Sequence, residues 1–380
     1  MDVAYVLSFI ASFLQAVFTP TLVIYAYNLS LTELQIGFIT GFASLIYIVG
    51  ALLSAILYRK LGAAKTILLS FCLIAAGLWA HTLAADFTSL LLPASTVLLG
   101  FGVFWPAVES SLSTKGSSVS LFSFSWSSGS LAGALITSSL LRIDLKLLFV
   151  FYSLVAFSGS VLSPRMKHQV KTSRGMAMQP NNSLKRLLLL LTPWFYCLAY
   201  SASSSGVFTF YPIFIESHSL SKDYISLVNF SMLFTRTLTF FFFEKLPAFS
   251  KNILLASLLF GAGITLTRTS DPFLTFLIAS VIGFSQGIVY ATALEQVFNR
   301  GQGVERATSL FESFIGLGYA VAPPLSSLAN ALLGVEPISF SSIMSIFLVL
   351  PVTFFNTKRR RKDAWSKEGL GFPIGKNNNP

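Results

Sequence analysis

The chain has 380 residues, of which 54% are hydrophobic and only 11% charged, and its formal net charge is +11. An ordinary soluble domain carries roughly 25% charged residues, so this composition excludes a typical soluble protein. Apolar stretches long enough to cross a hydrocarbon core of roughly 30 Å recur from end to end. The sequence therefore predicts an all-α membrane protein embedded in a lipid bilayer, with no nucleic-acid partner.

Apolar runs separated by turn residues and charges predict the positions of the membrane helices. The first run lacks the basic region and cleavage site of a signal peptide, so we expect it to be retained as a helix. The prediction is twelve transmembrane helices, at residues 4–27, 36–58, 65–84, 88–110, 118–141, 145–163, 187–214, 222–243, 251–268, 272–297, 305–332 and 338–355.

The distribution of basic residues predicts the orientation of these helices. With both termini in the cytoplasm, 21 of the 26 Lys and Arg residues fall in inner segments and four in outer loops, while Arg236 lies inside a span. Cytoplasmic loops of membrane proteins are enriched in Lys and Arg. We therefore expect a multi-pass protein of the cell membrane with cytoplasmic N- and C-termini.

Internal similarity predicts how the chain is divided. The stretch SLTELQI at 30–36 aligns with SLSKDYI at 219–225, an offset of 189, and the same offset relates Gly129 to Gly318. GVFWPA from Gly102 resembles GIVYAT from Gly287 at an offset of 185. These matches link each helix to the sixth helix after it, which indicates a duplicated six-helix unit with pseudo-two-fold symmetry.

Four segments follow from this duplication. We predict an N-terminal half at 1–163, a basic cytoplasmic linker at 164–186, a C-terminal half at 187–357 and a basic cytoplasmic tail at 358–380. The tail sequence KRRRKDAWSK indicates either an anchor near anionic lipid or a docking or address signal.

Four charges lie inside the predicted spans. At a rise of 1.5 Å per residue, Arg236, Glu312, Glu295 and Glu109 are all placed within roughly 10 Å of the inner helix ends. Charges at this depth are costly and mark functional or paired sites. Glu312 is expected to couple protons or to pair, whereas Glu109 and Glu295 favour inner-gate or helix-end roles.

Arg236 has several possible roles. It can form a structural ion pair with Glu312 or Glu295, or act as a fixed cation. A fixed cation would hold an anionic substrate group or tune a proton-carrying carboxylate. Snorkelling of its side chain to the inner interface is the remaining interpretation.

Enzymatic functions find no support in the sequence. No phosphate-binding loop occurs, and the apolar chain leaves no soluble domain long enough for catalysis. The three histidines and two cysteines have no metal-ligand spacing. We expect no catalytic residue, no metal and no cofactor, and a proton or ion gradient is the candidate source of energy.

Three motifs resemble those of the major facilitator superfamily of secondary transporters, and this resemblance covers roughly residues 1–357. NLSLTELQIGFITG is similar to the family's entry to the second helix. YRKLGAAK stands where the motif G-x-x-x-D-R-x-G-R-K belongs, and it keeps Gly62 but has Arg59 in place of the aspartate. GSLAGALITS resembles the antiporter motif G-x-x-x-G-P-x-x-G-G, with Gly129 and Gly133 kept and Ala134 in place of the proline.

The resemblance implies a central cavity lined by the first, fourth, seventh and tenth helices. On these helices stand aromatic, amide and hydroxyl side chains suited to a small organic solute, neutral or amphipathic, although each of them can instead serve helix packing. They are Gln15, Trp105, Tyr196, Tyr200, Ser203, Gln286 and Tyr290. The resemblance also implies that the two halves rock on helices that pack closely through small residues, namely Gly129, Gly133, Gly316 and Gly318.

The function that the resemblance implies is secondary active transport of a small organic solute by alternating access, in a monomer, with proton coupling as an option. Two alternatives remain open. One is a drug-type proton antiporter for efflux. The other is a transporter-like protein that no longer transports and serves as a sensor or assembly factor.

Overall fold

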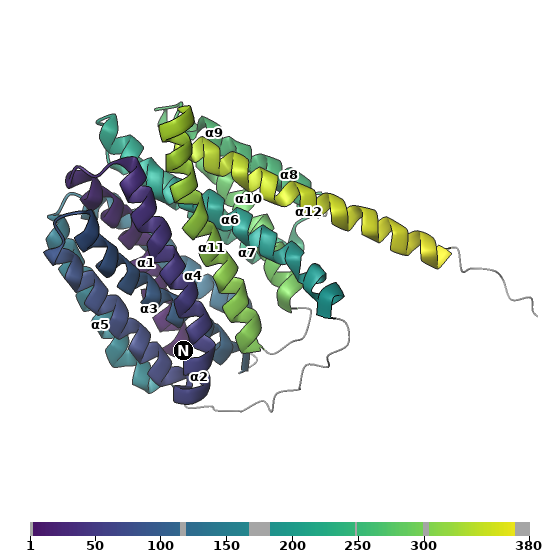
Figure 1. Ribbon diagram of the computed structural model, residues 1–380, viewed down its shortest axis with the longest axis horizontal. Coiled ribbons are helices and arrows are strands. Elements are labelled where there is room, and N and C mark those ends of the chain that lie inside the picture. The colour runs from purple at the N-terminus through teal and green to yellow at the C-terminus, as the bar shows by residue number, and fades with distance from the viewer. Residues whose placement is uncertain (1–2, 115–118, 167–182, 248, 299–303, 369–380) are drawn as a thin grey trace, which may run out of the picture.

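The computed structural model of the protein describes residues 3–114, 119–166, 183–247, 249–298 and 304–368. Lys115, Arg300 and most of the predicted linker lie outside these residues. The described elements are helices, and the α-helices form one bundle (Figure 1). They are α1 Val3–Asn28, α2 Glu33–Ala80, α3 Phe87–Thr114, α4 Val119–Leu140, α5 Leu145–Leu162, α6 Ser183–Ser217, α7 Asp223–Phe242, α8 Ile253–Leu259, α9 Gly263–Leu266, α10 Pro272–Phe298, α11 Val304–Leu333 and α12 Pro337–Glu368.

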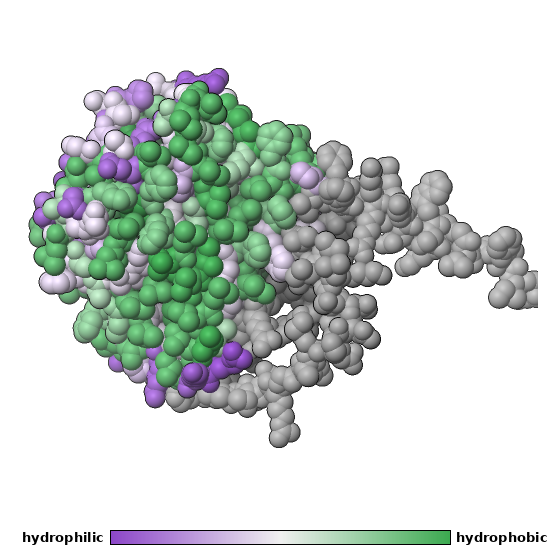
Figure 2. Space-filling model, in the orientation of Figure 1, coloured by the Kyte–Doolittle hydropathy of each residue, from purple (hydrophilic) through white to green (hydrophobic). Residues whose placement is uncertain are grey.

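The surface of the bundle matches a membrane environment. In Figure 2 a broad apolar region covers the middle of the visible face, and the polar residues gather toward its two ends. Within the described ranges, six helical stretches are long and apolar enough to cross a membrane, or up to seven if the bent pair α11 and α12 counts as one. One of the six, Glu33–Leu83, is 51 residues long, which is too long for a single crossing.

This long stretch is two antiparallel helices joined by one glycine. Gly62 has φ 77° and ψ 169°, which is non-helical and breaks α2 in two. After the second arm, the carbonyl oxygen of Ala84 accepts a hydrogen bond from the Tyr25 hydroxyl near the end of α1, at 2.6 Å. The chain therefore returns to the end from which α2 began. The arms correspond to the predicted helices 36–58 and 65–84, and a glycine bend replaces the expected loop.

The predicted duplication reappears in the backbone. Ser30 and Ser219 are the described non-glycine residues with positive φ, at 61° and 52°. In both turns the following leucine N–H bonds a carbonyl five residues back, Leu31 to Ala26 at 3.2 Å and Leu220 to Ile215 at 2.9 Å. This is the long hydrogen bond of a Schellman helix end. Two positions 189 residues apart thus share one rare turn, which supports the duplication.

Three helices depart from their predicted bounds. The ninth predicted helix, 251–268, is interrupted by a 3₁₀ turn, Phe260–Ala262, between α8 and α9. α6 begins at Ser183, inside the predicted linker. α12 continues to Glu368 and projects from the bundle (Figure 1), because the Lys, Arg, Glu and Ala of this stretch are good helix formers.

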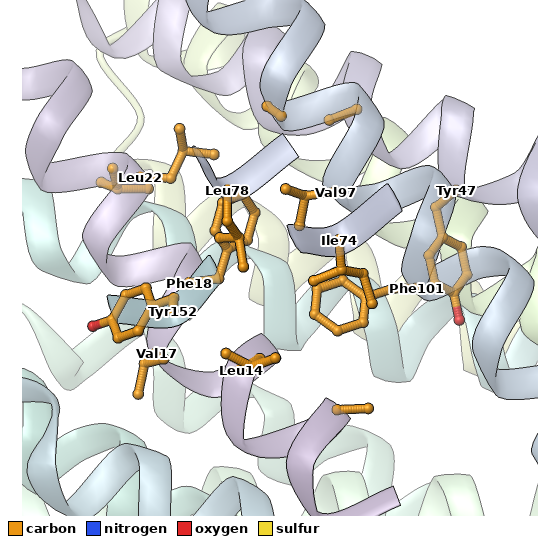
Figure 3. Packing of buried hydrophobic residues seen from close by; sticks show 14 of the residues in the cluster. Leu14, Val17, Phe18, Leu22, Tyr47, Ile74, Leu78, Val97, Phe101 and Tyr152 are labelled. Carbon is orange, nitrogen blue, oxygen red and sulfur yellow. The ribbon is translucent and has the colours of Figure 1, made fainter. Parts of the chain in front are cut away.

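The interior around α1, α2 and α3 is packed with aliphatic and aromatic side chains (Figure 3). Leu14, Val17 and Phe18 of α1 belong to the same cluster as Ile74 and Phe101. Glycines bring the helix backbones together there. A Cβ placed on Gly100 would lie 2.8 Å from the Ser70 carbonyl oxygen, so a larger side chain would separate α3 from α2.

The bend at Gly62 generates a stability prediction. Its φ and ψ fall in a region that is essentially restricted to glycine, where another residue costs about 1–3 kcal/mol. Gly62→Ala should therefore lower the apparent unfolding temperature in detergent by several degrees. Gly261→Ala is the matched control, since a Cβ there meets its nearest neighbour at 3.7 Å. Equal unfolding temperatures for the two variants would contradict this account of the bend.

Candidate functional site

A cavity of about 150 Å³ lies inside the bundle, between helices of the two predicted halves. Side chains of α1, α2, α3 and α4 line it from one half, and those of α6, α7, α10 and α11 from the other. Three charged residues are among the lining side chains, Glu109 on α3, Arg236 on α7 and Glu312 on α11. The cavity is therefore an aromatic and apolar chamber with a few ionisable groups, as ligand sites generally are.

The structure brings four of the seven predicted cavity residues to this chamber. Gln15, Trp105, Tyr200 and Tyr290 line it, and the Trp105 ring N–H donates to Gln15 Oε1 at 3.2 Å. Trp105 and Tyr290 occupy matching positions in the two aligned stretches GVFWPA and GIVYAT.

The other three predicted residues lie elsewhere in the C-terminal half. Tyr196 pairs its hydroxyl with that of Thr353 at 3.2 Å. Gln286 donates from Nε2 to Ser203 Oγ, also at 3.2 Å, and both side chains are fully buried. These contacts join helices to one another, which is the packing role that the sequence left open for such residues.

Arg236 is buried, with 5% of its surface exposed, and forms no salt bridge with a described residue. Its Nη1 donates to the Tyr200 hydroxyl at 2.7 Å. The guanidinium carbon lies 5.4 Å from the centre of the Tyr200 ring and 5.7 Å from that of Trp126, within cation–π range. Its Nε is buried and has no hydrogen-bond partner among the described residues. The side chains in direct contact with this cation are therefore neutral.

Aromatic rings form a continuous wall beside Arg236. The Trp126 ring centre lies 6.4 Å from that of Trp105 and 6.3 Å from that of Tyr290, and Tyr290 lies 5.0 Å from Tyr200. Phe240 packs on both Trp126 and Tyr290. This wall spans both halves, since Trp105 and Trp126 come from the first and the others from the second.

The two acidic residues of the cavity lie against each other. Glu109 and Glu312 interact through their carboxyl groups, although they come from different halves. The Tyr47 hydroxyl of α2 donates to Glu312 Oε2. Glu109 Oε2 is buried and has no hydrogen-bond partner among the described residues. Glu295 is exposed on α10 and does not line the cavity, so the candidate ion pair with Arg236 is not formed.

The four predicted interface glycines are distributed differently from the expectation. Gly129 and Gly133 pack against α1, within their own predicted half, since a Cβ on either would meet the Phe9 or Phe13 carbonyl oxygen at 2.2 or 2.9 Å. Gly318 packs on Ser201 of α6, again within one half. Gly316 alone of the four faces the other half, where its added Cβ would lie 2.8 Å from the Tyr47 ring.

Other small residues carry the contact between α2 and α11. A Cβ on Gly37 would meet Ser327 Oγ at 2.5 Å, and one on Gly41 would meet the Ala320 carbonyl oxygen at 2.7 Å. Asn330 Nδ2 donates to Glu33 Oε2 at 2.7 Å at the end of the same contact.

A second contact joins α4 and α7 at the same end of the bundle. Arg142 and Asp223 form an exposed salt bridge at 2.8 Å. Beside it, the Ser138 N–H donates to Ser226 Oγ at 2.8 Å. The two predicted halves are therefore held together at the end that carries the connections after α1, α4, α6 and α11, which we define as the closed end.

Tyr47 and Trp126 line the cavity but were not predicted from the sequence. The family pattern directs attention to four cavity helices, whereas these residues stand on α2 and α4. A usable signal was present in both cases, because Tyr and Trp in membrane helices concentrate at the interfaces with water. A Tyr or Trp in the middle of a span needs a hydrogen-bond partner for its polar atom.

The fold and the cavity define a polytopic helical membrane protein with an internal chamber lined by helices of both predicted halves. Residues 4–303 match the family model of the Major Facilitator Superfamily. The chain belongs to this superfamily, whose members are transporters and not enzymes. No curated protein matches the sequence.

Two solved structures share the fold at low identity. A point mutant of the nucleoside transporter NupG has a TM-score of 0.70 at 15% identity, over 93% of this chain and 97% of that one. A bacterial homolog of the human lysosomal transporter Spinster, inward-facing and occupied, has a TM-score of 0.69 at 16% identity, over 94% of this chain and 96% of that one.

The Arg236–Tyr200 contact generates the second prediction. A hydrogen bond to a charged group contributes about 1.5–3 kcal/mol, so Tyr200→Phe should lower the free energy of unfolding by an amount in that range. Tyr290→Phe is the matched control, because Tyr290 has a similar burial and its ring contacts would remain. The measurement is thermal unfolding of both variants in detergent. Similar losses in the two would show that Arg236 does not depend on the Tyr200 hydroxyl.

Proposed function

We propose that the protein is a secondary transporter that moves a small organic solute by alternating access, with the Glu109–Glu312 pair carrying a coupling proton. The observation that supports this most directly is the cavity itself, which lies between helices of both halves and contains ionisable groups from both. In the proposed arrangement the transporter is a monomer in the cell membrane with both termini in the cytoplasm. The halves comprise residues 1–163 and 187–357, joined by the linker at 164–186 and followed by the basic tail at 358–380.

Alternating access is supported by the closed end. In the predicted topology this end faces outward, and its contacts are of a kind that can separate. The Arg142–Asp223 salt bridge is exposed, and such pairs contribute about 0–1 kcal/mol. The α2–α11 contact includes close backbone approaches at Gly37 and Gly41. Opening here, with closure at the other end, would expose the cavity to the outside.

Proton coupling is supported by the contact between Glu109 and Glu312. Two carboxylates in one enclosed site repel each other, and each is costly to desolvate, so adjacent buried carboxyls hold a proton between them. Because one carboxyl comes from each half, movement of the halves would change their separation. Proton occupancy would therefore depend on the conformation of the bundle.

We infer that the transported solute is a small ring compound. The aromatic wall offers stacking, and Gln15 and Tyr200 offer polar contacts. Because NupG is a nucleoside transporter, uridine belongs in the test panel as a neutral ring solute, with benzoate as an anionic one. Proteoliposomes loaded with a pH-sensitive dye would report both solute-dependent flux and proton movement. A drug-type antiporter would move protons against the solute, and a sensor would move neither.

The closed end yields a prediction for alternating access. In a cysteine-free background, Gly37→Cys with Ser327→Cys should form a disulfide on oxidation. A Cβ on Gly37 lies 3.2 Å from Ser327 Cβ, just below the roughly 3.5–4.5 Å usual for disulfides. The bridge would lock α2 to α11, so solute flux into proteoliposomes should be lost on oxidation and return with dithiothreitol.

The control for this cross-link has the same geometry inside one half. Gly263→Cys with Ser342→Cys places its two Cβ atoms at the same 3.2 Å, between α9 and α12. That bridge should leave flux unchanged. Full flux through the oxidised Gly37–Ser327 pair, with the bridge confirmed by mass spectrometry, would show that the closed end does not open during transport.

The carboxyl pair yields a separate prediction. Glu312→Gln keeps the shape of the side chain but cannot exchange a proton. It should abolish solute accumulation driven by a pH gradient while exchange of labelled for unlabelled solute continues. Glu244→Gln, on an exposed acid outside the cavity, should retain both activities. Undiminished pH-driven accumulation by Glu312→Gln would remove Glu312 from the coupling mechanism.

A further inference from the structure

Arg236 forms no direct ion pair with a described residue. It is 5% exposed, its hydrogen bond goes to the neutral Tyr200, and its Nε has no partner among the described residues. Leaving a cation unpaired in such a buried position is strongly unfavourable. A guanidinium presents its N–H donors as a planar fork that matches a carboxylate. The group that would offset this cost is therefore an anion that arrives with a ligand.

The rest of the chamber limits the charge of that anion. Among the described lining residues Arg236 is the one basic side chain, and Glu109 and Glu312 supply acidic groups. A second negative charge on the ligand would find no cation and would meet these carboxyls. A phosphate monoester, which carries about −1.5 to −2 at neutral pH, fits less well than a carboxylate. The chamber is suited to a single negative charge.

The walls limit the body of the ligand. Trp126 lies against the Arg236 guanidinium at 5.7 Å and continues into Trp105 and Tyr290, so a planar ring attached to the anion would meet aromatic faces. The volume is about 150 Å³. An engineered apolar cavity of that size in another protein admits benzene. The space therefore accommodates one ring.

We propose that the cavity binds a monocarboxylate built on a single aromatic ring, with the carboxylate on Arg236 and the ring against Trp126 and Tyr290. This assignment rests on the proposed transport function only in identifying the bound acid with the transported solute. Binding itself requires no movement of the halves.

The test is binding of benzoate and benzamide to the full-length protein in nanodiscs, by isothermal titration calorimetry. The two probes have nearly the same shape and differ in charge. Benzoate should bind at least about tenfold more tightly than benzamide to the wild-type protein, as expected for a charge-assisted hydrogen bond. Phenylphosphonate, a dianion at pH 8, should bind more weakly than benzoate.

Two variants assign the preference to Arg236. Arg236→Gln should bring the benzoate and benzamide affinities to within about threefold. Arg236→Lys should restore part of the difference, because it keeps the charge but loses the fork. Arg268→Gln, at an exposed arginine outside the cavity, should bind both probes like the wild type.

Several results would overturn the assignment. Equal binding of benzoate and benzamide by the wild type is one, and it needs no variant. Absence of benzoate binding at millimolar concentration is another, as is unchanged benzoate preference in a folded Arg236→Gln protein. Arg236-dependent binding of benzoate without flux in proteoliposomes would keep this assignment and reject the transport proposal. Flux of uridine with no benzoate binding would reject this assignment and keep the transport proposal.

Discussion

Close approach between helix backbones is the constraint on which this bundle depends. Lipid is as apolar as leucine, so no hydrophobic force pulls membrane helices together, and dispersion contacts at short range must do so. The glycines that permit this close approach leave no room for a side chain. A Cβ on Gly102 would lie 2.2 Å from the Tyr47 carbonyl oxygen, and one on Gly283 would lie 2.1 Å from that of Met232. Each pairs helices within one predicted half, whereas Gly37 and Gly41 pair the halves with each other.

The duplication explains both the regularity of the bundle and the chemistry of its cavity. The turn at Ser30 recurs at Ser219, so the backbone has kept its symmetry where helix ends must be satisfied. The same offset of 189 residues relates Tyr47 to Arg236. Both side chains line the cavity, yet one is a neutral hydroxyl that donates to a carboxyl and the other is a cation. The two halves thus share a scaffold and differ in the charge that they present at corresponding positions.

Much of the fold was predictable because the physics of a bilayer leaves few choices. A span must be apolar and helical, so hydropathy predicted the membrane helices. The internal similarity and the motif resemblance then implied the family's fold. The bend at Gly62 was not predicted, since a single glycine replacing a loop has no distinctive composition. The small-residue motif at Gly129 and Gly133 correctly indicated close packing. It did not identify the partner, because spacing within one helix carries no information about which helix faces it.

The site was harder to predict than the fold. Arg236 and Glu312 were recognisable as charges in apolar segments, but depth along a helix does not fix the direction of a side chain. Glu295 lies close to the same depth and is exposed, while Glu109 reaches the cavity and meets Glu312. Trp126 and Tyr47 stand on helices outside the expected four. The rotation of each helix about its own axis decides which of its side chains face the cavity. Tertiary packing sets this rotation, so the sequence of one helix does not reveal it.

Charge balance in the cavity connects the two proposals. In the proposed transporter without solute, one negative charge on a carboxyl pair that shares a proton would offset the positive charge of Arg236. When a monocarboxylate binds to Arg236, the chamber becomes neutral again only if the pair takes up a second proton. A proton without the acid, or the acid without a proton, leaves one uncompensated charge in an enclosed, weakly polarisable site, where such a charge is most costly. The halves would therefore reorient readily when both are bound or neither is. This would be the condition for obligatory coupling, and in the proposed mechanism it would arise from one arginine and two carboxyls rather than from direct contact between the proton and the solute.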